Sequence, residues 1–125
     1  MSTKNYFTQS EQSCPCCGVN GFKPATLKRL NLLRAYLDFP LPMSSMYRCA
    51  AYNKLRGFTE THETGQAGDT VLSHKRAYAV IAAAPKFGFT GIGVKQKGKL
   101  SGRMLHLDDL PEMLPSRPRP HIWSY

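Results

Sequence analysis

The sequence predicts a single α+β domain in which a small, mostly antiparallel sheet is flanked by two main helices. Three observations lead to this prediction. The chain of 125 residues is long enough for one modest hydrophobic core. One early and one central segment carry the spacing or the boundary residues of helices. Short strand-like segments with tight, glycine-containing connections cluster later, an order typical of α+β domains.

The two helices have the clearest local signals. Leucines recur at steps of three and four within residues 25–37, directly after Pro24, which predicts an amphipathic helix. A second helix is predicted over residues 74–84. Ser73 is its expected N-cap, and Pro85 is expected to end it.

The predicted strands are shorter than the helices. We expect them at residues 43–48 and 67–72, after a turn within 87–94, and finally at 103–107, with a hairpin loop at 95–99. Between them, residues 49–55 indicate a helical turn and residues 57–68 a loop rich in Thr and Gly. We expect residues 1–23 to form an irregular, cysteine-containing lead-in and residues 111–125 a proline-rich tail packed on the domain.

The charge and hydropathy of the chain restrict its partners. A formal net charge of +9, with a pI near 9.7, favours an anionic partner such as nucleic acid, an acidic membrane face or an anionic cell-wall polymer. No stretch approaches the ~20 apolar residues of a membrane span. The first residues contain no apolar run of the kind found in secretory signals, so we expect synthesis and folding in a cytoplasm.

Three residues carry the strongest chemical signal: His62, Asp69 and His106. Two imidazoles and one carboxylate are the usual protein ligands of an open zinc site, which leaves a fourth position for water. Gly65 and Gly68 allow the backbone between the first two residues to turn sharply, so both side chains can reach one point. Ordinary structural histidines and a turn aspartate explain the same residues about equally well on this reasoning alone.

The remaining histidines are weaker candidates. His74 begins a predicted helix beside basic residues, and His121 lies in the proline-rich tail. In a strand, residues two apart share a face, so His106 and Asp108 should project together while Asp109 faces away.

A resemblance to a known family rests on these residues and their surroundings. His62-Glu-Thr-Gly-Gln-Ala-Gly-Asp69 resembles the His-x-x-Gly-x-Ala-x-Asp motif of the D-Ala-D-Ala carboxypeptidase family of zinc peptidases. That family includes VanX- and VanY-type enzymes and small phage peptidoglycan endopeptidases (endolysins). Further segments resemble the family in collinear order, over about residues 5–125: Ser44 to Asn53, Gly88 to Val94, Leu105 to Asp108, and the Trp-containing end from Arg117 to Tyr125.

The resemblance implies roles for individual residues. His62, Asp69 and His106 stand where the family has its zinc ligands. Arg48 stands where the family has an arginine that holds substrate and polarises the scissile carbonyl, a task suited to the fixed donors of a guanidinium. In the matched segments we also expect substrate contacts from three further residues: Ser45, Glu60 and Trp123.

The general base is the point at which the sequence departs from the family. Many members carry an acidic residue three positions before the last ligand, where this chain has Arg103. We therefore expect Asp108, on the face of His106, to activate the attacking water. The alternative role for Asp108 is to orient that ligand. Glu60 and Glu63 are the next candidates.

Four cysteines indicate a second feature. Cys14 and Cys17 have Cys-x-x-Cys spacing, and Cys49 can join them in space to hold a structural zinc ion, whereas Cys16 has no assigned role. We favour the alternative that these are free thiols packed under the lead-in.

Three functions follow from these observations. The first is a monomeric zinc peptidase that cleaves an amide bond of peptidoglycan stem peptides or cross-links, L-Ala-D-Glu or D-Ala-containing, as a bacteriolytic phage endolysin. Such an enzyme would fold in the host bacterial cytoplasm and reach the cell wall after release by a separate membrane-permeabilising protein. The second is a D-Ala-D-Ala carboxypeptidase or dipeptidase. The third is a small basic zinc-knuckle protein that binds nucleic acid, although no second Cys or His pair completes such a motif.

Overall fold

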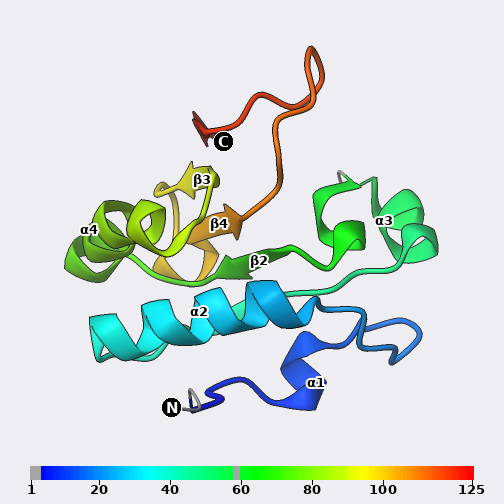
Figure 1. Cartoon of the computed structure of the whole chain (residues 1–125), viewed down its shortest axis with the longest axis horizontal. Helices are drawn as coiled ribbons and strands as arrows, with labels where there is room; N and C mark the ends of the chain where they lie inside the picture. The colour runs from blue at the N-terminus through cyan, green and yellow to red at the C-terminus, as the bar shows by residue number, and fades with distance from the viewer. Residues whose placement is uncertain (1–3, 58–59) are drawn as a thin grey trace.

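The computed structural model describes residues 4–57 and 60–125 (Figure 1). In the described part, four α-helices alternate with short strands and 3₁₀ helices. The α-helices are α1 (Gln9–Gln12), α2 (Pro24–Leu37), α3 (Ala50–Arg56) and α4 (His74–Ala83), and the 3₁₀ helices are η1 (Glu60–Thr64), η2 (Ala84–Phe87) and η3 (Leu100–Gly102). The strands are β1 (Met43–Ser45), β2 (Ala67–Thr70), β3 (Gly91–Lys95), β4 (Met104–Asp108) and β5 (His121–Ser124).

The strands form one sheet in the order β1-β2-β4-β3-β5. Neighbouring strands pair antiparallel, except that β5 runs parallel to β3. The predicted α+β class with a mostly antiparallel sheet is therefore confirmed. The predicted hairpin between β3 and β4 is also present, with η3 in its connection.

The two main helices form where the sequence predicts them. Pro24 occupies the first turn of α2, where its missing N–H costs nothing, and Asp38 ends the helix in the left-handed conformation. Ser73 is the N-cap residue of α4, as predicted, although its side chain makes no capping hydrogen bond. After α4 the chain tightens into η2, which contains Pro85.

Two predictions about the ends of the chain are wrong. The lead-in is not wholly irregular, because α1 forms a short helix whose N-cap Thr8 exchanges hydrogen bonds with Glu11 in a capping box. The strand at 104–108 is not the final one, because β5 forms within the proline-rich tail and pairs with β3. The reason is long-range pairing, which the tail's own composition does not reveal.

The hydrophobic core lies on one face of the sheet. Leu105 and Leu107 of β4 point into it together with Ile92 of β3, and helices α2 and α4 contribute Leu33 and Val80. Because successive side chains of a strand point to opposite faces, His106 and Asp108 face away from this core. The core thus provides a rigid support for the opposite face, where the polar residues of β4 gather.

The lead-in is attached to the loop that precedes β2. The backbone N–H of Lys23 donates to the carbonyl of Gly65, 2.8 Å away, and that of Tyr47 donates to Gln12, 3.2 Å away. Gly65 has φ +73°, and a Cβ there would overlap the carbonyl oxygen of Gly21. Among residues 4–57 and 60–125, none of the helices has the length and apolar character needed to cross a membrane.

Candidate metal centre and cleft

A row of residues crosses the polar face of the sheet. In the strand register, Asp69 of β2 lies opposite His106 of β4, which lies opposite Gly93 of β3, which lies opposite Trp123 of β5. Directly paired residues present their side chains on the same face. Gly93 leaves room for the indole: a Cβ at that position would lie 2.7 Å from Nε1 of Trp123. The centroids of the His106 and Trp123 rings are accordingly 5.2 Å apart.

His62 reaches this row from η1. Its Nδ1–H donates to the carbonyl of Met46, 2.7 Å away, and its side chain is fully buried. Its Nε2 lies 3.2 Å from Oδ1 of Asp69, and Nδ1 of His106 lies 3.1 Å from the same oxygen. The ligand atoms of these three residues all lie within 4.8 Å of one another. The structure therefore brings together the three predicted metal ligands.

The hydrogen-bonding roles at this point fit a bound cation. A carbonyl accepts only, so the Nδ1 of His62 carries the proton toward Met46, and the Nε2 of a neutral ring presents a lone pair to Asp69. His106 faces a carboxylate at each ring nitrogen, Asp69 at Nδ1 and Asp108 at Nε2. Acceptors that face one another need a proton or a metal ion between them. Zinc suits this set of two imidazoles and one carboxylate.

Charge within the site shifts the ionisation of two groups. Burial alone would raise the pKa of the Asp69 carboxyl, but hydrogen bonds with His106 and His62 outweigh burial and hold the pKa well below its ordinary value. Burial alone would lower the pKa of His106, but its contacts with Asp108 and Asp69 outweigh burial and raise it. Asp69 is therefore ionised and ready to hold a positive charge.

Asp108 is enclosed by two cationic or donor groups. Its Oδ2 lies 2.7 Å from Nε2 of His106, and Arg119 donates to both oxygens, at 2.9 Å from Nε and 2.7 Å from Nη2. Burial opposes ionisation, but these two partners outweigh it and lower the pKa of Asp108 to about 2. The carboxylate has no solvent-exposed area. This position suits a residue that orients His106, the alternative role, better than a residue that activates water.

A cleft of about 1040 Å³ opens over the metal ligands. Asp69 and His106 lie in its wall together with Arg48, the predicted substrate-binding arginine. Further residues that line it include Glu63, Lys95, Arg117, Arg119, His121, Trp123 and Tyr125. Trp123, predicted to contact substrate, is thus in the cleft.

Arg48 and Tyr125 place two further polar groups in the cleft wall. Arg48 follows β1, and its backbone N–H donates to the carbonyl of His62, 3.3 Å away, which fixes it relative to the metal ligands. Burial lowers the pKa of Arg48, opposed by the charge of Asp69. Burial raises the pKa of Tyr125, so its hydroxyl stays protonated and can donate a hydrogen bond.

Three further positions for which the sequence makes a prediction are Ser45, Glu60 and Asp109. Ser45 does not line the cleft but a separate hollow of about 530 Å³ beside α1, since β1 is an edge strand whose register shifts between Met43 and Ser45. Its position does not favour the predicted contact with substrate. Glu60 begins η1, and its side chain lies outside the described residues. Asp109 faces away from the site, as predicted, and pairs with Arg29 at 3.2 Å.

Arg119 and Tyr125 are site residues to which the sequence alone assigned no role. Both come from the proline-rich tail and enter the site only because β5 pairs with β3. One signal was available for Arg119: a carboxylate predicted to share the buried face of His106 needs a cationic partner. Nothing in the local sequence identifies which of the chain's basic residues supplies it.

The fold and the site together define a class of protein, a small α+β domain with an open His-Asp-His metal centre in a cleft. A family model described as Peptidase M15 matches residues 5–108, which include all three candidate ligands. The chain therefore belongs to the Peptidase M15 family, whose members are zinc metallopeptidases. A search of curated proteins and a search of solved structures each found no match.

Proposed function

We propose that this protein is a zinc-dependent peptidase that hydrolyses an amide bond in the stem peptides or cross-links of bacterial peptidoglycan, as a bacteriolytic phage endolysin. One observation carries the proposal: His62, Asp69 and His106, all within the residues that match Peptidase M15, converge on one point, and Asp69 and His106 line a large open cleft. Zinc held by His62, Asp69 and His106 supplies Lewis acidity toward a carbonyl and makes water a stronger nucleophile at neutral pH.

Other residues of the cleft would bind the substrate. Arg48 binds the substrate carbonyl from the side of η1, where its planar donors stabilise the negative charge that develops on the oxygen. Trp123 and Tyr125 form the wall supplied by β5 and hold the peptide against the sheet. A wide cleft of this kind suits an extended polymer segment better than an enclosed small molecule.

Glu63 is the carboxylate that we assign to proton transfer. Among the described residues, Glu63 and Asp69 are the acidic side chains that line the cleft, and Asp69 holds the metal. Oε2 of Glu63 accepts a hydrogen bond from Asn53, 3.3 Å away, which orients it. The residue directly follows the ligand His62 in the chain and lines the same cleft as Asp69 and His106.

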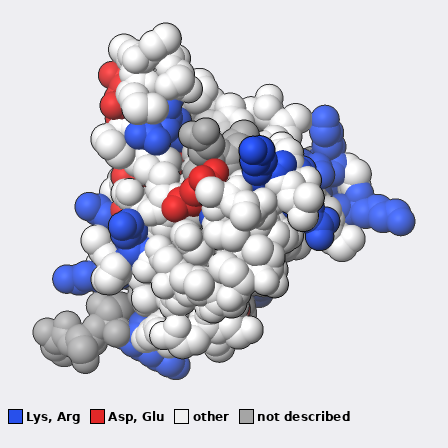
Figure 2. All heavy atoms as spheres, turned by 90° about the vertical axis from the view of Figure 1, so that its right-hand side faces the viewer, with Lys and Arg blue, Asp and Glu red and all other residues white. Residues whose placement is uncertain are grey.

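The charge of the protein supports an anionic target. The formal net charge is +9, and Lys and Arg side chains lie around the rim of the face that carries α3, where Asp and Glu are few (Figure 2). A positive surface concentrates an enzyme on an anionic wall or outer-membrane face. We further propose that the protein acts as a monomer, with no specific nucleic-acid partner, and reaches the wall from the host cytoplasm.

The decisive experiment is mass spectrometry of the fragments released from purified peptidoglycan by the zinc-loaded protein. Wild type should release peptides whose new termini identify one cleaved bond, a chelator should abolish release, and added zinc should restore it. His106→Ala should lose zinc and activity. Arg48→Ala should keep zinc but lose roughly 2–4 kcal/mol of transition-state stabilisation, while the exposed Lys54→Ala serves as control. Zinc-independent release, or none from any peptidoglycan, would refute the proposal.

A second candidate function is removal of a terminal D-Ala. The positively charged side chains of the cleft support this candidate. Lys95 and Arg117 line the same cleft as Arg48, and such groups bind a free carboxylate well. A carboxypeptidase would release single D-Ala residues from uncrosslinked stem peptides and leave the cross-linked polymer intact. The same mass spectra separate the two functions.

A further inference from the structure

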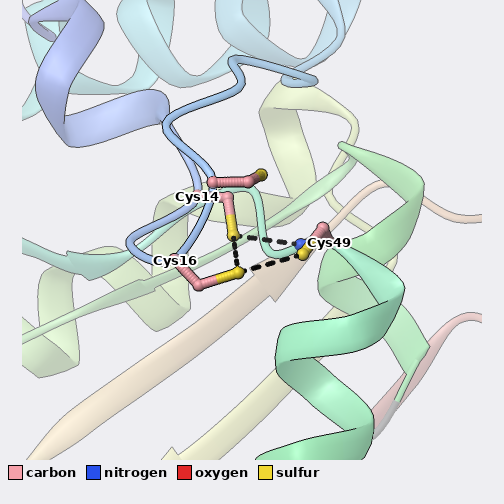
Figure 3. A group of neighbouring side chains, drawn as sticks. Cys14, Cys16 and Cys49 are labelled. Atoms are coloured by element: carbon pink, nitrogen blue, oxygen red, sulfur yellow. Dashed lines mark hydrogen bonds between the residues drawn. The ribbon is translucent and has the colours of Figure 1, made fainter.

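A second cluster of metal-ligating side chains lies away from the cleft. Cys14, Cys16 and Cys17 come from the loop that follows α1, and Cys49 is the N-cap residue of α3. The four sulfur atoms lie within 4.8 Å of one another. Figure 3 shows the sulfur of Cys16 directed at those of Cys14 and Cys49, at 3.8 Å and 3.4 Å respectively.

The backbone around this cluster holds the sulfur atoms in place. The N–H of Cys49 donates to Sγ of Cys14, and the N–H of Tyr52 donates to Sγ of Cys49, each at 3.4 Å. The loop is closed by two backbone hydrogen bonds of 2.9 Å, from Cys14 to Val19 and from Gly18 to Cys14. Gly18 has φ +72°, which the tight turn after the cysteines requires. Hydrogen bonds of this kind hold the two sulfur atoms in place and would orient them as metal ligands.

Hydrophobic packing does not explain the cluster. Cys14 is buried, but Cys16 and Cys17 are exposed and Cys49 is only half-buried. The expectation of free thiols packed under the lead-in therefore fits Cys14 and not its neighbours. Two segments far apart in the chain bring four sulfur atoms together, although most of these side chains are not buried. Because hydrophobic packing does not explain this convergence, a bound metal ion is the better explanation.

We propose that Cys14, Cys16, Cys17 and Cys49 bind a structural zinc ion, separate from the His62, Asp69 and His106 centre. Zinc prefers four thiolates in a tetrahedron, and Zn–S bonds of about 2.3 Å place the sulfur atoms ~3.8 Å apart. Cys16 lies 3.8 Å and 3.4 Å from two of its partners by sulfur–sulfur distance, and all four sulfur atoms lie within 4.8 Å of one another, so small movements would bring them to this spacing. A closed set of four protein ligands leaves no position for substrate, so this ion supports the fold.

A zinc ion at this position would connect two segments of the chain. Cys49 directly follows Arg48, and a zinc bridge would tie the start of α3 to the lead-in at Cys14. The backbone hydrogen bond from Tyr47 to Gln12 joins the same two segments. The structural zinc would therefore fix the backbone next to Arg48 and, if Arg48 binds substrate as proposed, help to position it.

Metal content tests the proposal independently of any activity. Wild-type protein purified under reducing conditions should contain two equivalents of zinc per chain by elemental analysis. A variant with His62→Ala and His106→Ala should keep one. A variant with Cys14→Ser and Cys49→Ser should lose one, whereas Val19→Ser, exposed in the same loop, should lose none. These results do not depend on what the cleft cleaves.

Spectroscopy covers the case in which a cysteine variant fails to fold. The histidine double variant keeps all four cysteines, and its Co²⁺ form should show thiolate-to-metal charge-transfer absorption of a tetrahedral sulfur site. A thiol reagent should release that metal and titrate the four thiols. Absence of metal from the histidine variant, iron in place of zinc, or a mass showing Cys16 and Cys49 joined in a disulfide would each overturn the proposal.

Discussion

Asp108 and Asp109 are neighbours in the chain and serve opposite sides of the sheet. Asp108 lies between His106 and Arg119 on the polar face. Asp109 accepts hydrogen bonds from Thr26 at 2.9 Å and ties the end of β4 to α2. The alternation of a strand thus gives one carboxylate to the metal centre and the next to the packing of a helix.

The variant Asp108→Asn tests the orienting role of Asp108. The amide keeps the shape but loses the negative charge and replaces one acceptor oxygen by an NH2 group, which cannot accept from His106 or Arg119, so we expect zinc affinity at the centre to fall by ~10–100-fold. Turnover should recover when zinc is raised to saturation. Chelator competition measures the affinity, and Asp109→Asn, which alters contacts with α2 and Gln66 but none with His106 or Arg119, should leave it unchanged. Normal zinc affinity with a rate loss of ~10²-fold or more would make Asp108 the base instead.

Glu63→Gln tests the assignment of the base. The substitution removes basicity and retains the hydrogen-bonding contact with Asn53, so the variant should bind zinc normally yet lose turnover by ~10²-fold or more. Steady-state hydrolysis of a defined stem-peptide substrate provides the measurement. Glu112→Gln, an exposed change in the tail that keeps an acceptor for the backbone N–H of Arg119, is the matched control. Unchanged kinetics would exclude Glu63 and leave Glu60 as the next carboxylate to examine.

At the scale of elements, the turn between η1 and β2 packs closely against the lead-in. Gly65 and Gly57 both have positive φ, +73° and +69°, but a Cβ at Gly57 meets nothing within 4 Å whereas one at Gly65 would overlap the backbone of Gly21. A comparison of substitutions at the two glycines therefore distinguishes the cost of a left-handed backbone conformation from the cost of a steric clash. Gly65 joins η1, which carries His62, to β2, which carries Asp69.

We expect Gly57→Ala to lower the free energy of unfolding by ~1–2 kcal/mol, the cost of the left-handed conformation. Gly65→Ala should cost more, because the lead-in must also move away, by a further ~1–3 kcal/mol. It should also weaken zinc binding, since His62 and Asp69 flank the turn. Denaturant unfolding of both variants tests the difference. Equal losses in the free energy of unfolding would show that the lead-in can move away from residue 65 at little cost.

The sequence predicts those elements whose signals are local. Leucine spacing and Pro24 identify α2, and the alternation of β4 correctly places His106 and Asp108 on one face. The capping box of Thr8 and Glu11 was readable in the sequence but marks only a four-residue helix. β5 carries no such signal, because its partner β3 lies far away in the chain. The missed role of Arg119 follows from the missed strand.

At the scale of the whole molecule, the net charge of +9 leads us to expect that electrostatic attraction contributes to binding of the proposed peptidoglycan substrate. Interactions among exposed charges weaken as the Debye length shrinks from ~10 Å at 0.1 M salt to ~3 Å at 1 M. The basic residues of the loop after β3, Lys97 and Lys99, are exposed. They can therefore contribute to binding at a distance without shaping the cleft.

Binding to insoluble peptidoglycan should fall steeply as salt is raised, whereas turnover of a short, uncharged peptide substrate should change little. A variant with Lys97→Gln and Lys99→Gln should show weaker binding at low salt and a shallower salt dependence. Co-sedimentation with purified cell walls measures both. Salt-independent wall binding, together with salt-dependent binding to DNA, would instead point to a nucleic-acid partner.

The metal centre is assembled from contacts that are distant along the chain. His106 and Asp69 are 37 residues apart, and Arg119 reaches Asp108 from beyond β4. Contacts of this kind form late, because closing a long loop costs entropy before the contact returns any stability. During refolding, helical circular dichroism should therefore recover before the cleft can act. We therefore expect catalytic competence to appear late in folding, once strands from both halves of the chain have paired.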